Sequence, residues 1–189
     1  MRLLVLLISI LFSVPSLASW QLDNENSLVN FTSTKKGTAA EVHTFDSVSG
    51  SIASSGAAKL IIDLNSVNTK IEVRDTRMKE MLFETAKFTS AEFVTNISQT
   101  FIADLAVGTS QEVMLQGQLS LHGEKKSFQA PVYVTKVNEN KLLVVSIMPI
   151  IIDANDFALT KGIAKLQEIA GLDSISTIVP VNFILTFSR

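Results

Sequence analysis

The stretch EVMLQGQLSLHGEKKSFQAPVYVTKV, residues 112–137, decides the fold of this 189-residue chain. Apolar residues or glycine occupy every second position before the turn-forming segment HGEKK (122–126), and the alternation resumes from Phe128 to Val134. Successive side chains of a strand point to opposite faces, so this pattern indicates antiparallel sheet with one covered face and one wet face. The stretch therefore predicts two neighbouring strands joined by a turn.

The same rhythm recurs along most of the chain, for example in KLIIDLN (59–65) and TIVPVNFILTFS (177–188). Short turn-forming segments at 54–58, 107–111 and 138–141 separate adjacent runs. About eight strands fit this template. So many antiparallel strands in one short chain must split into a sandwich or close into a barrel, and closure removes the exposed edges. We expect an all-β fold, an antiparallel up-and-down eight-stranded barrel.

Two stretches break the alternation. VRDTRMKEMLFETAKF (73–88) and FALTKGIAKLQEIAG (157–171) carry apolar residues at helical spacing, and Gly171 suits the end of a helix. One or two short helices are therefore expected beside the strands.

The first eighteen residues have the features of an export signal. Arg2 precedes an apolar run from Leu3 to Phe12, and small residues end the segment at Ala18. The run is too short to cross a bilayer of roughly 30 Å as an anchor. We expect a signal peptide over 1–18, a mature domain over 19–189, and release into the periplasm without stable membrane insertion.

The composition excludes several functional classes. The chain has no cysteine, which removes thiol catalysis and Cys-based metal sites. Its formal net charge is −2, and its Lys and Arg residues are scattered along the sequence. That pattern favours neither a nucleic-acid partner nor an anionic membrane surface.

No catalytic or metal-binding motif is evident. His122 lies in a turn and is expected to be solvated. His43 has Glu41 two residues before it, on the same strand face, but a metal site needs a third ligand. The chain has no nucleophile elbow, phosphate loop or dinucleotide fingerprint. We therefore expect no catalytic residue, no metal and no cofactor.

Phenylalanine is abundant, with eleven residues against one Trp and one Tyr. Most of these rings would fill an ordinary core. The alternative is an apolar tunnel that accepts a long hydrocarbon chain, with a few polar groups at its mouth.

The segment NSVNTKIEVRDTRMKEMLFETAKFTSAEF (65–93), together with FDSVSGSI (45–52), LQGQLSLHGEKKSFQAPVYV (115–134) and DANDFAL (153–159), resembles the YceI-like family of polyisoprenoid-binding, lipocalin-like barrels. Ala158 stands where that family usually has Gly. The resemblance implies that the 73–88 connection lies across one end of the barrel, held by Arg74 and Asp75. Together with the apolar faces, it implies ligand contacts by Phe31, Phe45, Arg74, Asp75, Met78, Met81, Phe83, Phe88, Phe93, Phe128, Phe157 and Phe183.

The leading hypothesis is a periplasmic protein that holds a long-chain isoprenoid or fatty-acyl lipid, such as a polyisoprenoid or a quinone tail, for transport, storage or stress protection. An enzyme acting on a chain lipid in the same cavity is the second hypothesis, and inward-pointing polar groups such as His43 would support it. A filled-core interaction module is the third. The sequence leaves open whether the protein forms a homodimer.

Overall fold

The computed structural model describes residues 19–189, apart from the side chain of Gln99, so the predicted signal peptide lies outside the described residues. Twelve strand segments make up one sheet: β1 Trp20–Leu22, β2 Leu28–Lys35, β3 Ala39–Phe45, β4 Val48–Ile52, β5 Ala57–Asp63, β6 Val67–Asn68, β7 Ser90–Asn96, β8 Ser110–Leu121, β9 Glu124–Asn138, β10 Lys141–Ser146, β11 Ile150–Asp153 and β12 Ile178–Ser188. The helical segments are η1 Leu64–Ser66, α1 Glu72–Arg77, the π-helical turn η2 Met78–Leu82, α2 Gln99–Asp104, η3 Ala154–Phe157 and α3 Thr160–Ile169.

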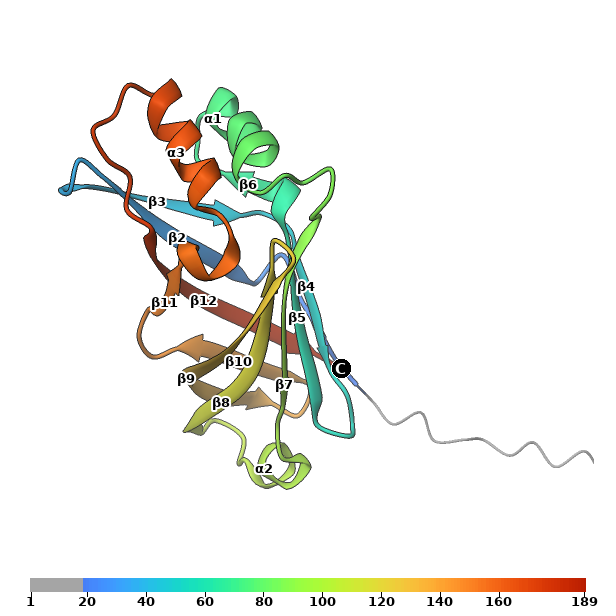
Figure 1. Ribbon diagram of the computed structural model, residues 1–189. Coiled ribbons are helices and arrows are strands. Elements are labelled where there is room, and N and C mark those ends of the chain that lie inside the picture. Colours follow the sequence, from blue (N-terminus) through green and yellow to red (C-terminus); the bar gives the residue numbers. More distant parts are fainter. Residues whose placement is uncertain (1–18) are drawn as a thin grey trace, which may run out of the picture.

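These segments form the predicted eight-stranded up-and-down barrel. Four of its strands are each interrupted by a bend, so that β1 continues into β2, β3 into β4, β5 into β6, and β10 into β11. Each strand pairs antiparallel with the next along the chain, and β12 closes the ring by pairing with both β1 and β2. Figure 1 shows the C-terminus beside the start of β1 as a result. The prediction is confirmed, and the extra segments are explained by the bends.

The hairpin of β8 and β9 has the predicted faces. His122 and Gly123 both adopt positive φ, at 50° and 84°, as a tight turn between twisted strands requires. Leu115 lies opposite Ala130 in the register. Both side chains are buried inside the barrel, while Met114 on the other face is half exposed.

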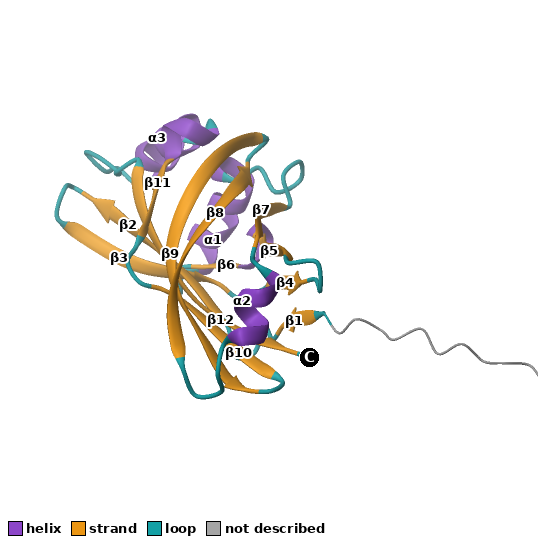
Figure 2. Ribbon diagram, turned by 90° about the horizontal axis from the view of Figure 1, so that it is seen from below, coloured by secondary structure: helices purple, strands orange, loops and turns teal. Residues whose placement is uncertain are grey.

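The helices cover the two ends of the barrel. Helices α1 and α3 lie together over one end, and α2 lies at the other (Figures 1 and 2). The helices predicted within 73–88 and 157–171 are confirmed. Gly162 lets α3 approach η2 closely, because a Cβ there would lie 2.5 Å from the carbonyl oxygen of Met81. Among residues 19–189, no helix has the length and apolar character that crossing a bilayer requires.

The sequence missed two features of these ends. Helix α2 was not predicted, because its six residues are too few to show a helical period; Ser98 caps it by accepting a hydrogen bond from the amide of Phe101. The expectation of a solvated His122 was wrong. Its side chain is only 8% exposed, since the turn folds back against Phe88 and places Nε2 2.8 Å from Oε2 of Glu84.

Candidate functional site

A cavity of about 440 Å³ lies inside the barrel, and residues of α1, η2 and α3 line it at one end. Its wall is formed by inward side chains of the strands and by the sides of the helical segments that face the barrel, and most of the lining residues are aliphatic or aromatic. This volume falls in the range of small-molecule sites, roughly 300–1,000 Å³. A barrel of eight strands is just wide enough inside for one slender ligand.

The wall contains most of the residues expected to contact a ligand. Those that line the cavity are Phe31, Phe45, Arg74, Met78, Phe83, Phe93, Phe128 and Phe183. They come from β2, β3, α1, η2, β7, β9, β12 and the residue that follows η2. The fold therefore brings together side chains that are up to 152 residues apart in the sequence.

Four other residues from the same expectation lie outside the wall. Phe157 is fully buried and stacks against Phe128 at a centroid distance of 6.1 Å, so it supports the wall from behind. Phe88 packs on His122 at the turn between β8 and β9. Met81 is half buried on η2, and Asp75 faces the backbone of Thr69.

The cavity opens between the start of α1 and the end of α3. Ile71 and Val73 line it and are still 48% and 56% exposed, and Ala170 across the gap is also both lining and exposed. The opposite end is closed by apolar side chains that include Leu105, which is 1% exposed after α2. The cavity thus has its mouth at the α1–α3 end.

One corner of the wall is polar. The Nε2 atom of His43 lies 2.9 Å from Oγ of Ser33 and 3.9 Å from a carboxylate oxygen of Glu41. That carboxylate also accepts from Nζ of Lys35 at 2.8 Å and from Arg74. His43 is only 4% exposed, and among the described residues neither its Nδ1 nor the Nε of Arg74 has a hydrogen-bond partner.

The pKa values of this corner follow from its burial and charges. Burial, followed by the positive charge of Arg74, lowers the pKa of His43 below its ordinary value of 6.5. The hydrogen bond from Lys35, supported by Arg74, lowers the pKa of Glu41 below 4.5. At neutral pH the corner therefore presents a neutral imidazole beside an ion-paired carboxylate.

The sequence did carry a signal for this corner, namely the turn-forming Lys36-Gly37 pair between two strands. In the structure both residues adopt positive φ and make a tight turn that pairs Lys35 with Ala39. Counting back from that turn sets Ser33 opposite Glu41 and leaves His43 on the same face two residues further along. Ser33 and Lys35 were nevertheless not named as candidates.

Arg74 and Asp75 hold the start of α1 separately rather than by pairing with each other. Oδ1 of Asp75 accepts from the amide of Thr69 at 2.8 Å, and Nη2 of Arg74 donates to the carbonyl of Thr69 at 2.6 Å. Arg74 then reaches Glu41 on β3. These contacts attach the helical connection to the rim of the barrel.

The polar corner does not form a metal site or a catalytic triad. Residues 19–189 contain no cluster of three or more His, Asp or Glu side chains suited to a metal ion. In a Ser-His-Asp triad the carboxylate binds the imidazole nitrogen that faces away from the serine. Here Glu41 approaches Nε2, the nitrogen that also faces Ser33.

Comparison with known proteins matches residues 20–187 to the YceI-like domain. The chain belongs to the YceI-like family. A solved polyisoprenoid-binding domain from Saccharophagus degradans, implicated in plant cell wall breakdown, is 39% identical, with a TM-score of 0.88 over 90% of this chain and 98% of that one. No curated protein matched the chain in sequence.

Two more distant structures share the fold. BcnA of Burkholderia cenocepacia is 19% identical, with a TM-score of 0.68 over 87% of this chain and 98% of its own. A YceI protein of Campylobacter jejuni is 14% identical, with a TM-score of 0.57 over 78% of this chain and 84% of its own.

In this YceI-like chain, Ala158 follows Asp156-Phe157 at the position where the sequence resemblance led us to expect glycine. Ala158 adopts a left-handed conformation, with φ 54° and ψ 25°. That conformation costs an L-residue about 1–2 kcal/mol. Phe157, which directly precedes this residue, is fully buried in the core and anchors the turn.

Proposed function

We propose that this YceI-like protein binds one long-chain isoprenoid or fatty-acyl lipid inside its barrel and acts as a periplasmic carrier or store. The observation that carries the proposal is the mainly apolar cavity of about 440 Å³ with a polar corner near its mouth. A module with a filled core would contain no cavity of this size. The 39% identical Saccharophagus degradans protein, described as polyisoprenoid binding, supports the same ligand class.

Burial of the chain supplies enough free energy for useful affinity. Each methylene transferred from water contributes about 0.8 kcal/mol, so ten buried methylenes contribute about 8 kcal/mol before the costs of association. The contacting side chains are the rings of Phe31, Phe45, Phe83, Phe93, Phe128 and Phe183, together with Met78. Asp75, Met81, Phe88 and Phe157 contribute by holding the wall and the cover in place.

The polar corner suits the head of such a lipid. His43 Nδ1 and Arg74 Nε are buried polar atoms without partners among the described residues. An unmade hydrogen bond of this kind costs about 1–3 kcal/mol. A ligand whose chain lies among the Phe rings and whose oxygen-bearing head meets this corner would recover that cost.

An enzyme acting on a chain lipid is the second candidate, because Ser33 and His43 lie within hydrogen-bond distance in the cavity wall. The arrangement lacks a carboxylate on Nδ1 to orient the imidazole. The carboxylate of Glu41 is instead engaged by Lys35 and Arg74. Binding is therefore the function that this geometry supports better.

Native mass spectrometry of protein purified from periplasm without detergent tests the proposal. We expect the mass of a chain that starts at Ser19 plus the mass of one long-chain lipid. Solvent extraction followed by fragmentation would give the class of that lipid. The same spectra report any dimer. Protein that carries no lipid and takes up neither a polyprenol nor a long-chain fatty acid would refute the binding function. Hydrolysis or isomerisation of the added lipid, abolished by Ser33→Ala, would favour the enzyme.

A further inference from the structure

The mouth of the cavity is surrounded by exposed apolar side chains. Ile71 and Val73 at the start of α1 are about half exposed, and Ile169 at the end of α3 is 40% exposed. Single exposed aliphatic residues are common on protein surfaces. Ile71 and Val73 differ because they line the mouth of the apolar cavity, so they extend its wall outward into solvent, and Ile169 directly precedes Ala170, which also lines it.

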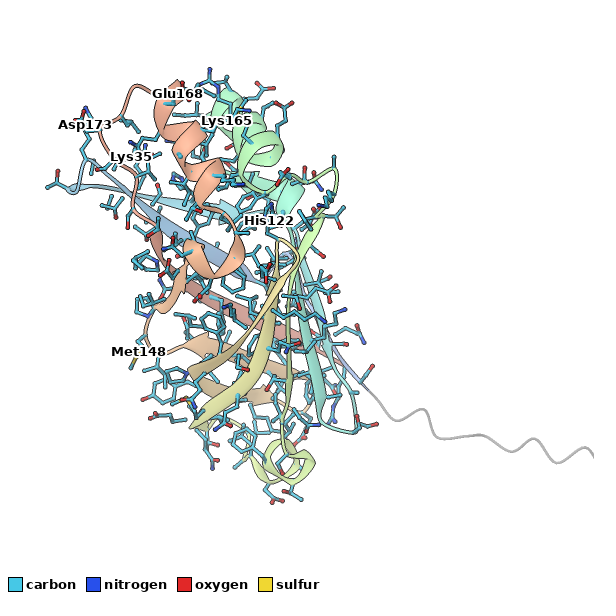
Figure 3. The ribbon with its side chains drawn as sticks, viewed as in Figure 1. Lys35, His122, Met148, Lys165, Glu168 and Asp173 are labelled. Carbon is cyan, nitrogen blue, oxygen red and sulfur yellow. The ribbon has the colours of Figure 1, made fainter. Side chains whose placement is uncertain are left out.

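Basic side chains that the sequence scatters are gathered at this end by the fold. Four lysines are exposed and have no salt-bridge partner among residues 19–189: Lys36, Lys70, Lys161 and Lys165. Figure 3 shows Lys165 and Lys35 at the α1–α3 end, with Glu168 and Asp173 also present there.

The balance of charge differs between this end and the rest of the chain. Eight Lys or Arg and six Asp or Glu lie in the segments at this end, 35–41, 68–83 and 158–176. The remainder of residues 19–189 contains seven Lys or Arg and twelve Asp or Glu. The three segments therefore carry a net charge of +2 in spite of the exposed Glu72 and Glu80, whereas the remainder carries −5.

We propose that this mouth surface, formed by Ile71, Val73, Ile169 and the four exposed lysines, docks on an anionic lipid bilayer. Apolar side chains beside basic ones suit the membrane interface, where the former insert and the latter meet phosphate groups. A protein docked mouth-down can exchange a chain lipid with the bilayer without exposing the chain to water. The purpose of this docking rests on the proposed lipid-binding function, but the docking itself can be measured without any cargo.

Vesicle flotation tests the proposal, using phosphatidylcholine vesicles with and without phosphatidylglycerol. Intact mass is measured first, because an uncleaved apolar N-terminal stretch would itself bind vesicles. We expect binding to the phosphatidylglycerol vesicles that weakens with added salt.

Three double variants locate the contact. Ile71→Ser/Val73→Ser is expected to weaken binding at least tenfold, since each methylene withdrawn from the bilayer weakens it about fourfold. Lys161→Gln/Lys165→Gln is expected to weaken binding by about fivefold per lysine. The matched control, Val94→Ser/Val137→Ser, changes two exposed valines on β7 and β9 and should bind as the wild type does.

Wild-type protein that fails to float with phosphatidylglycerol vesicles overturns the proposal, as does equal weakening by the mouth variants and the control. Lipid content is read separately by native mass spectrometry. Protein that retains lipid but does not float refutes docking alone, whereas protein that floats but never carries a lipid refutes the binding function alone.

Discussion

Filling the cavity from the barrel wall should exclude the ligand without harming the fold. Ala130 on β9 is 3% exposed, lines the cavity and lies opposite Leu115 on β8. The substitution Ala130→Leu adds three carbons to this wall, and they would occupy space that a bound chain otherwise fills. The lipid-free protein should be as stable as the wild type or more so, because cavity volume is itself destabilising.

The magnitude follows from the carbons displaced. If each added carbon excludes one methylene of the ligand, the variant loses about 2.4 kcal/mol of binding free energy at about 0.8 kcal/mol per methylene. That loss corresponds to a dissociation constant weakened about 60-fold. Titration with a fluorescent long-chain fatty acid, with a polyprenol as competitor, measures the change directly.

The matched control is Ala57→Leu, which makes the same chemical change at an exposed position on β5. It should leave the affinity unchanged. If Ala130→Leu binds as tightly as the wild type while remaining folded, the ligand chain does not lie beside the β8–β9 hairpin, and the assignment of the cavity as its site is refuted.

Four further changes test the polar corner and the covered end. The pKa of His43 is lowered in the folded state, so around and below pH 6.5 the unfolded chain binds more protons than the folded one. The free energy of unfolding should therefore fall as the pH drops from 6.5 toward the folded-state pKa. Urea unfolding should show that the His43→Gln variant lacks this pH dependence. Asp75→Ala leaves the buried amide of Thr69 unpaired and its hydroxyl with only the 3.4 Å contact to the carbonyl of Ile71, so it should cost about 1–3 kcal/mol and lower the melting temperature by roughly 2–4 °C per kcal/mol. Gly162→Val should cost about 1–3 kcal/mol by forcing α3 away from η2, with protease cleavage of the covered end reporting the displacement. Ala158→Gly should stabilise the protein by about 0.5 kcal/mol, since relief of the left-handed strain exceeds the entropy that glycine adds to the unfolded chain, and a lower denaturation midpoint would contradict this account.

The parts of the fold that could be predicted are those governed by local pattern. Alternation in β8, β9 and β12 identified the inward faces because one side of each strand is covered, and helical spacing identified α3. The bends that divide four strands leave the alternation nearly intact on either side, so the sequence showed eight strands where the structure has twelve segments.

The candidate site was less predictable, because the same residue type serves three different purposes. Phe128 lines the cavity, Phe157 supports it from behind, and Phe88 packs outside on His122. Local pattern marks all three as apolar positions, and only the packing of distant segments separates them. His43 was weighed as a metal ligand through Glu41, whereas its closest polar neighbour is Ser33 across the hairpin.

The closed ring of strands explains why the way into the cavity lies at an end of the barrel. Every strand of a closed barrel is paired, so a ligand cannot enter between strands without breaking a ladder of hydrogen bonds. The ends are the remaining routes, and the two covers are attached differently. The start of α1 is tied to the barrel rim through Arg74, Asp75 and Glu41, whereas α3 rests on η2 mainly by apolar packing around Ile163 and Gly162. Apolar contacts have no fixed geometry to break, so α3 can separate from α1 at a lower cost than any strand can leave the sheet. The mouth between them is therefore the easiest way into the cavity, and the polar corner lies next to it.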